Sequence, residues 1–441
     1  MHLPRRSPAR RRRVAALATC AALLVAACGS NPPSTGPTVA PSPATAAPPI
    51  GPSAGPTAPA ASAQPAAEVY GAIRKGVEAI RGLAPTDAVD PVTIDEVQLR
   101  TNIEAEFDAT QSPAQLKDTE DLLITLGLLP KGASLRQATL DFQAGQIAGY
   151  YSPDKDELFV VSRAGGRLGG VEKATYAHEF THQLQDQRFD LNALGLDATD
   201  QSDRSLARLG LVEGDAVSVQ TTWMTANLNA TELGELLSAA LDPAAVAALQ
   251  NAPPYLRDTA TFPYQDGPAF ATRLLASGGY AAIDAAFAAP PDSTEQVIHP
   301  DKYIAREPPI EVRLPGDVPA ALGSGWTEAG RDTLGELILR VWLRQGGVPF
   351  AAAQNAAAGW GGDRLLFLRG PDDQMSVALR TAWDSAADAE EFRAAASTAM
   401  RGLSLEGSVT RLSTFPEEVL IAIGDVAGPI TTALSRFQAG D

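Results

Sequence analysis

Two histidines and a glutamate form the pattern His-Glu-x-x-His near the middle of the chain, at His178, Glu179 and His182. In a helix, residues four apart lie about 40° apart around the axis, so both imidazoles project side by side and can reach one metal ion. Glu179 lies about 100° from His178 and can reach a water on that metal without filling a ligand position. The pattern therefore predicts metal-dependent hydrolysis.

The segment around this pair is suited to a helix. Residues 171–187 contain no proline or glycine. Tyr176, Phe180 and Leu184 repeat at four-residue spacing on the opposite side, which would pack in a core and leave the histidines facing a cleft. Histidine is also scarce, since the chain has four and His2 lies in a segment expected to be removed. The alternative is that the two histidines only pack in a core or lie in solvent.

A third metal ligand is predicted at Glu213, on a helix expected over residues 205–223. Its neighbours on that helix are mostly apolar, and a carboxylate in such surroundings is costly unless it is paired or bound to a metal. Two histidines and one glutamate, with a fourth position open to water, are the ligand set of a catalytic zinc site, whereas structural zinc sites are more often closed by cysteines. An internal salt bridge or a helix cap is the alternative role for Glu213.

These residues resemble the site of the gluzincin class of zinc metallopeptidases. Together with residues 178–191 (HEFTHQLQDQRFDL), residues 293–303 (STEQVIHPDKY) and 359–364 (GWGGDR) resemble a group of poorly characterised bacterial lipoproteins that carry the same site. The resemblance implies one Zn²⁺ per chain and a zincin-like α+β catalytic domain. It also implies that His178, His182 and Glu213 are the zinc ligands and that Glu179 is the general base.

The resemblance raises two questions about residues around the zinc. Familiar gluzincins often carry an acid four residues after the ligand glutamate, where it orients a histidine. Val217 occupies that position here, and the nearest acid, Asp215, lies about 200° away from Glu213 around the helix. Gluzincins also supply a His or Tyr from a later segment to stabilise the oxyanion. His299, in an expected loop, and Tyr303 are the candidates, with a purely structural role as the alternative for His299.

The N-terminus reads as a lipoprotein signal. Residues 1–28 comprise a basic start, an apolar run over 14–27 and the sequence Val-Ala-Ala-Cys, which predicts cleavage before Cys28 and attachment of lipid to it. An ordinary secretory signal with a chance cysteine is the alternative. Residues 29–65 are rich in proline and carry no charge, which predicts an extended, disordered tether. We therefore expect a protein that is anchored to the cell membrane and faces the extracytoplasmic side.

Charge narrows the range of partners. All 52 acidic residues and 29 of the 35 basic residues follow residue 65, so that part of the chain has a formal charge of −23. Such a balance argues against nucleic acid and against electrostatic adhesion to anionic lipid. Only Cys20 and Cys28 are present, and neither remains free in the exported domain, so the core alone must hold it together.

Elements expected elsewhere complete an α+β fold. Helices are predicted over 69–83, 94–107 and 113–128, and a β-hairpin over 147–161. The resemblance to zincins implies that a strand of this hairpin borders the cleft and could hold an extended peptide, with an ordinary sheet strand as the alternative. Residues 66–305 then form the zincin-like catalytic domain, with 253–255 and 262–267 expected as loops. Residues 306–441 form a C-terminal α+β portion in which 359–364 is expected to be a tight turn.

Zinc-dependent hydrolysis of peptide bonds is the function that these features favour. The partner is then a peptide or protein substrate. Two alternatives remain open: a non-catalytic surface lipoprotein that binds zinc, and a zinc hydrolase of a non-peptide amide such as a cell-wall link. The presence of Glu179 argues against the first, because a structural metal site does not need a general base.

Overall fold

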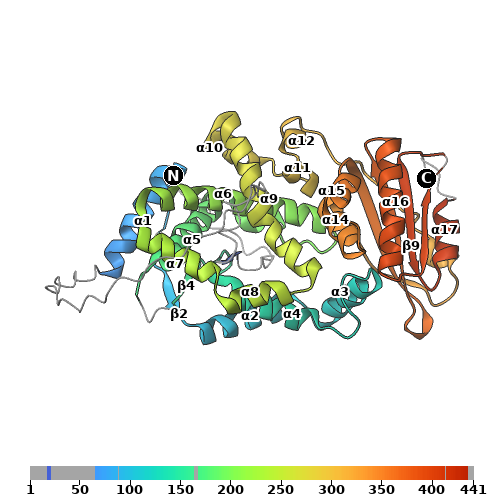
Figure 1. The fold of residues 1–441 in the computed structure, drawn as a ribbon, viewed down its shortest axis with the longest axis horizontal. Coiled ribbons are helices and arrows are strands. Elements are labelled where there is room, and N and C mark those ends of the chain that lie inside the picture. The colour runs from blue at the N-terminus through green and yellow to red at the C-terminus, as the bar shows by residue number, and fades with distance from the viewer. Residues whose placement is uncertain (1–16, 21–64, 88, 163–166, 413, 436–441) are drawn as a thin grey trace, which may run out of the picture.

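The computed structural model describes residues 17–20, 65–87, 89–162, 167–412 and 414–435. Cys28 and nearly all of the predicted tether lie outside these residues. The chain is α+β and mostly helical, with one sheet near the N-terminal end and another at the C-terminal end (Figure 1). No helix in the described residues is long and apolar enough to cross a membrane.

Helices fill the N-terminal part, and the three predicted there are present. Polar side chains begin three of these helices by accepting a hydrogen bond from the first turn: Asp95, Ser112 and Ser134. The four helices are α1 (Ala66–Arg81), α2 (Glu96–Thr110), α3 (Pro113–Thr125) and α4 (Leu135–Gln146).

The N-terminal sheet has the strand order β1-β3-β4-β2. Its centre is the predicted hairpin of β3 (Ile147–Ser152) and β4 (Glu157–Val161), and β2 (Val92–Ile94) runs parallel to β4. On its other edge β3 pairs antiparallel with β1 (Leu17–Cys20), which belongs to the predicted signal peptide. An edge of β3 is therefore filled by a segment far away in sequence.

The long helix α5 (Gly170–Phe189) packs against this sheet, and a second long helix, α6 (Ser202–Asn227), packs against α5. The short helix η3 (Leu191–Leu194) lies between them in the chain. As predicted, Tyr176, Phe180 and Leu184 of α5 are buried, packed against α1 and the sheet. The Tyr70 ring of α1 lies 4.5 Å from the ring of Tyr176. This apolar packing fixes which side of α5 faces α6.

The prediction of loops over residues 253–255 and 262–267 is wrong from Pro254 onward. Both segments lie in a single helix, α9 (Pro254–Gly278), which contains Pro263 and Pro268. Proline disfavours a helix interior because it lacks an N–H donor, but here burial against α6 outweighs that local preference. The neighbouring helices are α7 (Ala230–Ala240), α8 (Pro243–Asn251) and α10 (Tyr280–Ala288).

Close backbone contact explains how α9 packs so tightly on α6. A Cβ placed on Gly214 of α6 would lie 2.2 Å from the backbone oxygen of Gly267, and one on Gly267 would lie 2.4 Å from that of Gly210. Only glycine permits such an approach. Because Gly214 follows Glu213 directly, this contact brings α9 to the place where the predicted third ligand lies.

The C-terminal sheet has the order β5-β6-β7-β9-β8, with every pair antiparallel. The prediction of a tight turn over 359–364 is wrong beyond Gly359, since β6 begins at Trp360. Glycine is needed at position 362 of that strand, because a Cβ there would lie only 2.2 Å from the backbone oxygen of Ile310. The strands are β5 (Thr327–Asp332), β6 (Trp360–Arg369), β7 (Met375–Trp383), β8 (Gly407–Arg411) and β9 (Glu418–Gly424).

Helices cover both faces of this sheet. Short helices also replace most of the loop expected around His299. One face packs against α14 and α16, and the other against α17. The remaining helices are α11 (Thr294–Ile298), α12 (Pro300–Ile304), α13 (Val318–Ala321), α14 (Gly335–Gln345), α15 (Phe350–Ala357), η4 (Pro371–Asp373), α16 (Ala386–Gly402) and α17 (Ala427–Ser435).

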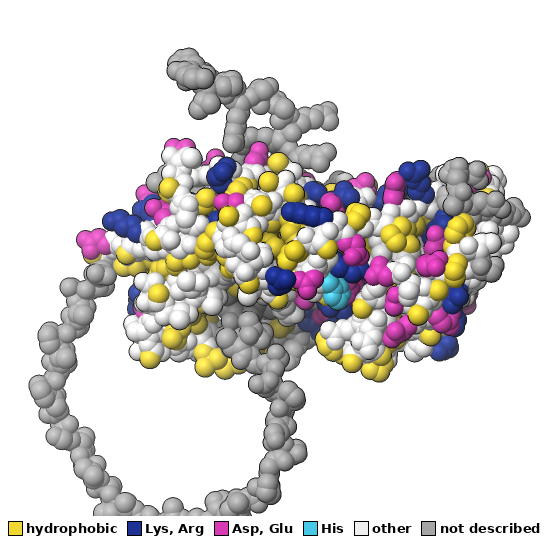
Figure 2. Space-filling view, turned by 90° about the horizontal axis from the view of Figure 1, so that it is seen from above, with side chains coloured by type: hydrophobic (Ala, Val, Ile, Leu, Met, Phe, Trp, Pro, Cys, Tyr) yellow, Lys and Arg dark blue, Asp and Glu magenta, His cyan; other side chains and the backbone are white. Residues whose placement is uncertain are grey.

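One hydrophobic core runs across the boundary predicted at residues 305 and 306. Its buried members include Leu211 and Phe262 from α6 and α9, and Leu337 and Phe367 from α14 and β6. On the face shown in Figure 2 the acidic and basic side chains are interspersed. The helical part and the C-terminal sheet are therefore packed as one body.

Candidate metal centre

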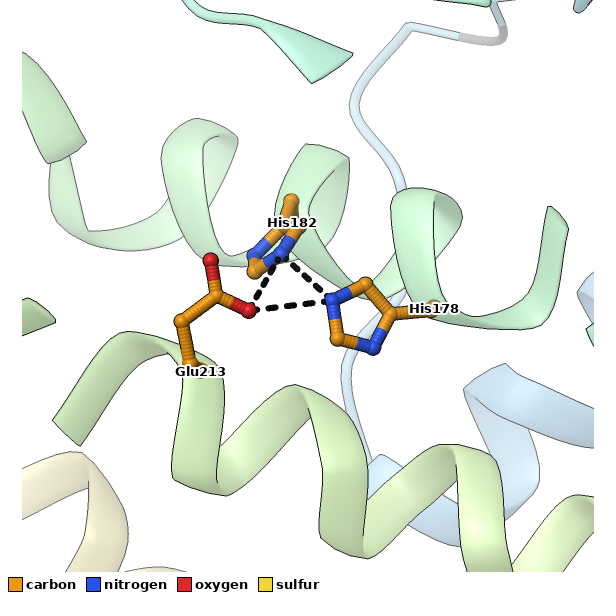
Figure 3. A group of neighbouring side chains, drawn as sticks. All are labelled: His178, His182 and Glu213. Carbon is orange, nitrogen blue, oxygen red and sulfur yellow. Dashed lines mark hydrogen bonds and ion pairs between the residues drawn. The ribbon is translucent and has the colours of Figure 1, made fainter. Parts of the chain in front are cut away.

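His178, His182 and Glu213 converge between α5 and α6 (Figure 3). The Nε2 atoms of the two histidines lie 2.9 Å apart. Oε2 of Glu213 lies 3.1 Å from Nε2 of His178 and 3.4 Å from Nε2 of His182. The three predicted ligands are therefore brought together, with one potential ligand atom from each within 4.8 Å of the others.

The chemistry of this group suits a cation. Two neutral imidazoles cannot both point a nitrogen lone pair at the other without repulsion, and a carboxylate beside them offers only acceptors. A proton or a metal ion must therefore lie among the three atoms. Two nitrogens and one carboxylate oxygen are a ligand set for zinc and for other divalent transition metals. The group can hold a metal ion, and its geometry alone does not choose which one.

The prediction that the histidines face an open cleft is wrong in this structure. His178 and His182 are fully buried, and Glu213 is 1% exposed. α6 lies directly against the histidine side of α5 and places Glu213 on the two ring nitrogens, and β1 also packs against α5.

Burial and mutual charge set the ionisation of the group. Burial lowers the pKa of His178, and the neighbouring His182 lowers it further. Burial alone would also lower the pKa of His182, but the Glu213 carboxylate outweighs it and raises that pKa to about 9. In return, despite burial, the charge on His182 lowers the pKa of Glu213 to about 2. Without a metal, a proton on His182 thus balances the Glu213 carboxylate.

The protonation of His182 should make metal affinity depend on pH. Zinc can bind Nε2 of His182 only after the proton has left, so below about pH 9 the proton competes with the metal. We expect the zinc association constant to rise about tenfold per pH unit between about pH 6 and 8, with release of about one proton. Competition with a chromophoric chelator, and calorimetry in buffers of different ionisation enthalpy, would measure both. An affinity independent of pH would contradict the protonated state of His182.

A glutamine provides the outer contact that the sequence left in doubt. Nδ1 of His182 lies 2.9 Å from Oε1 of Gln185, one turn further along α5. Nε2 of Gln185 donates to Asp215 at 2.9 Å. Asp215 thus faces away from the metal ligands, as its position on the helix predicts, yet it reaches His182 through Gln185. Spacing within α5 could have suggested Gln185, but only the fold reveals its link to Asp215.

Glu179 lies where α5 meets β3. It is fully buried, and a Cβ on Gly149 of β3 would lie 3.5 Å from Cγ of Glu179 and 2.5 Å from Cγ2 of Thr175. Gly149 therefore allows the strand to pass directly beside the predicted general base. β3 of the predicted hairpin thus lies beside Glu179, as the resemblance to zincins implies.

His299 and Tyr303 have other contacts. Nε2 of His299 lies 3.1 Å from Glu336, whose carboxylate raises the pKa of His299. The Tyr303 hydroxyl donates to the backbone oxygen of Ala289 at 2.7 Å. Their predicted role at the oxyanion stays a prediction. A tyrosine that the sequence analysis did not indicate lies beside the site: the ring of Tyr264, on α9, has its centre 6.4 Å from that of His178.

Comparison with known proteins covers only the C-terminal part. A family model described as a domain of unknown function (DUF8575) matches residues 322–419. This segment runs from just before β5 to the start of β9 and contains none of the three candidate ligands. No curated protein and no solved structure matches the chain. The metal centre therefore rests on its own geometry.

Proposed function

We propose that this protein is a zinc-dependent peptidase of the gluzincin type. The observation that supports this most directly is the buried group of His178, His182 and Glu213 with Glu179 on the same helix. A site that only stabilised the fold would not need a carboxylate next to the first ligand, whereas hydrolysis needs a base there.

In the proposed reaction, the three ligands hold the metal and Glu179 transfers the proton. Zinc, when bound by His178, His182 and Glu213, supplies a Lewis acid that polarises the scissile carbonyl and lowers the pKa of a water. Glu179 accepts a proton as the water oxygen bonds to the carbonyl carbon, and then gives that proton to the amide nitrogen as the C–N bond breaks. Hydrolysis therefore returns Glu179 to its ionised form.

An extended peptide is the substrate that the neighbouring strand favours. β3 already pairs antiparallel with β1, with Thr19 opposite Gly149 and Leu17 opposite Tyr151. Since Gly149 lies beside Glu179, a peptide added at this edge would run past the general base, held by backbone hydrogen bonds. Loss of residues 1–28, the predicted signal peptide, would free this edge. Lipid on Cys28 would then hold the enzyme at the outer side of the membrane.

Hydrolysis of a peptide library by the zinc-loaded chain tests this function. We expect new N-termini, detected by mass spectrometry, that vanish when a chelator removes the metal and return when zinc is restored. A chain that binds zinc but cleaves only cell-wall fragments would be the non-peptide amidase. A chain that binds zinc and cleaves neither would be a binding protein, and the peptidase proposal would be abandoned.

Tyr264 is the residue that we propose as donor to the carbonyl oxygen while it gains negative charge. Tyr264→Phe should lower kcat about 10²-fold, the usual cost of losing one such donor, without loss of zinc. Tyr303→Phe is the matched control, because that hydroxyl is already bound to Ala289, and its kcat should stay within about threefold of the original. Measured kcat and KM decide between them, and the reverse order would assign the role to Tyr303.

A further inference from the structure

A continuous set of hydrogen bonds leads from the metal centre to the end of α1. Oε1 of Gln185 lies 2.9 Å from Nδ1 of His182, and Nε2 of Gln185 donates to the Val212 oxygen at 3.0 Å and to Asp215 at 2.9 Å. Arg81, the last residue of α1, donates from Nε to the same Asp215 oxygen at 2.9 Å. All of these side chains are buried.

The partners of Gln185 allow only one orientation of its amide. The Val212 carbonyl and the Asp215 carboxylate accept hydrogen bonds and do not donate them, so the NH₂ group must face them. The amide oxygen then faces His182, and an oxygen there accepts only if Nδ1 carries a hydrogen. This fixes the histidine in the tautomer that leaves Nε2 for the metal.

Asp215 is held in turn by a charge from another helix. Arg81 is 1% exposed, and its second nitrogen donates to Asp284 of α10 at 2.6 Å. Its guanidinium also lies 4.8 Å from the centre of the Tyr280 ring. A buried ion pair of this kind adds little net stability over apolar residues of the same size. The ion pair with Arg81 does hold the Asp215 carboxylate in place as the acceptor for the amide NH₂ group of Gln185.

We propose that Gln185 is a positioning residue for His182, and that Asp215 and Arg81 hold it in its active orientation. The inference rests on the proposed metal site and adds to it the device that orients one ligand. α1, which carries no ligand, thereby becomes part of what determines metal affinity.

The test compares two glutamines on the same helix. Gln185→Met removes the acceptor for Nδ1 at nearly constant volume. Gln183→Met is the matched control, since Gln183 is equally buried but donates to the backbone oxygen of Asp87. Zinc affinity by chelator competition should fall about 10- to 100-fold for Gln185→Met and stay within about twofold for the control. The visible spectrum of the cobalt-loaded chain should change only for Gln185→Met.

Asp215→Asn provides a second variant in case Gln185→Met fails to fold. It keeps the shape of the side chain but removes the charge that fixes the amide, so zinc affinity should fall less than for Gln185→Met yet more than for the control. Equal zinc affinity and equal cobalt spectra for the original chain and both variants would overturn the positioning role alone. No zinc binding by the original chain would overturn the proposed function and this inference with it.

Discussion

Glu179→Gln should keep the metal and lose peptide hydrolysis. The amide has nearly the same shape as the carboxylate, and Glu179 is not one of the three convergent ligands, so zinc should still bind. An amide cannot take a proton from water, and removal of a general base lowers turnover by about 10²- to 10⁴-fold. Zinc per chain by elemental mass spectrometry and kcat on a cleaved peptide measure the two effects in one preparation.

Glu172→Gln is the matched control for this variant. Glu172 lies on the same helix and is also buried, but its carboxylate accepts from the backbone N–H of Gly169 as part of a capping box. Glutamine serves equally well at that position, so hydrolysis should be unchanged. Full activity in Glu179→Gln would exclude Glu179 as the base and leave the mechanism without a proton acceptor.

Replacement of a metal ligand should abolish zinc binding. His182→Ala leaves only His178 and Glu213 in the group, and two protein ligands do not make a zinc site. We expect zinc to fall from one per chain to background, an affinity loss greater than the roughly 10- to 100-fold typical of outer contacts. The same elemental analysis measures it.

His299→Ala is the control for loss of a histidine elsewhere. His299 lies on Glu336 and is not among the three convergent residues, so its removal should leave zinc at one per chain. Zinc retained in His182→Ala, or lost in His299→Ala, would show that the metal binds at another place.

Local pattern was sufficient to predict the centre of the site. Tyr176, Phe180 and Leu184 define a buried side of α5, and this fixes the opposite side for the histidines. Glu213 was predictable because its apolar surroundings on α6 leave a carboxylate in need of a partner. Both inferences concern residues within one helix, where 3.6-residue geometry determines which side chains share a face.

Contacts between distant segments could not be predicted in the same way. Pro263 and Gly267 indicate a break in a helix, yet α9 continues through both because glycines let it lie against α6. The glycines at the start of β6 suggest a turn, but Gly362 is needed for close approach of Ile310. The link from Gln185 to Arg81 joins residues 104 positions apart, across three helices. In each case tertiary packing outweighs local preference.

The shared core should make the helical part and the C-terminal sheet unfold together. Val212, next to the ligand Glu213, belongs to the same buried cluster as Leu337 and Phe367 of the segment matched by the family model. A cut between residues 305 and 306 would expose apolar surface on both fragments, so neither is expected to fold as an autonomous unit. Thermal unfolding should then be a single cooperative event. Metal bound at His178, His182 and Glu213 should raise the melting temperature of the C-terminal sheet together with that of the helical part.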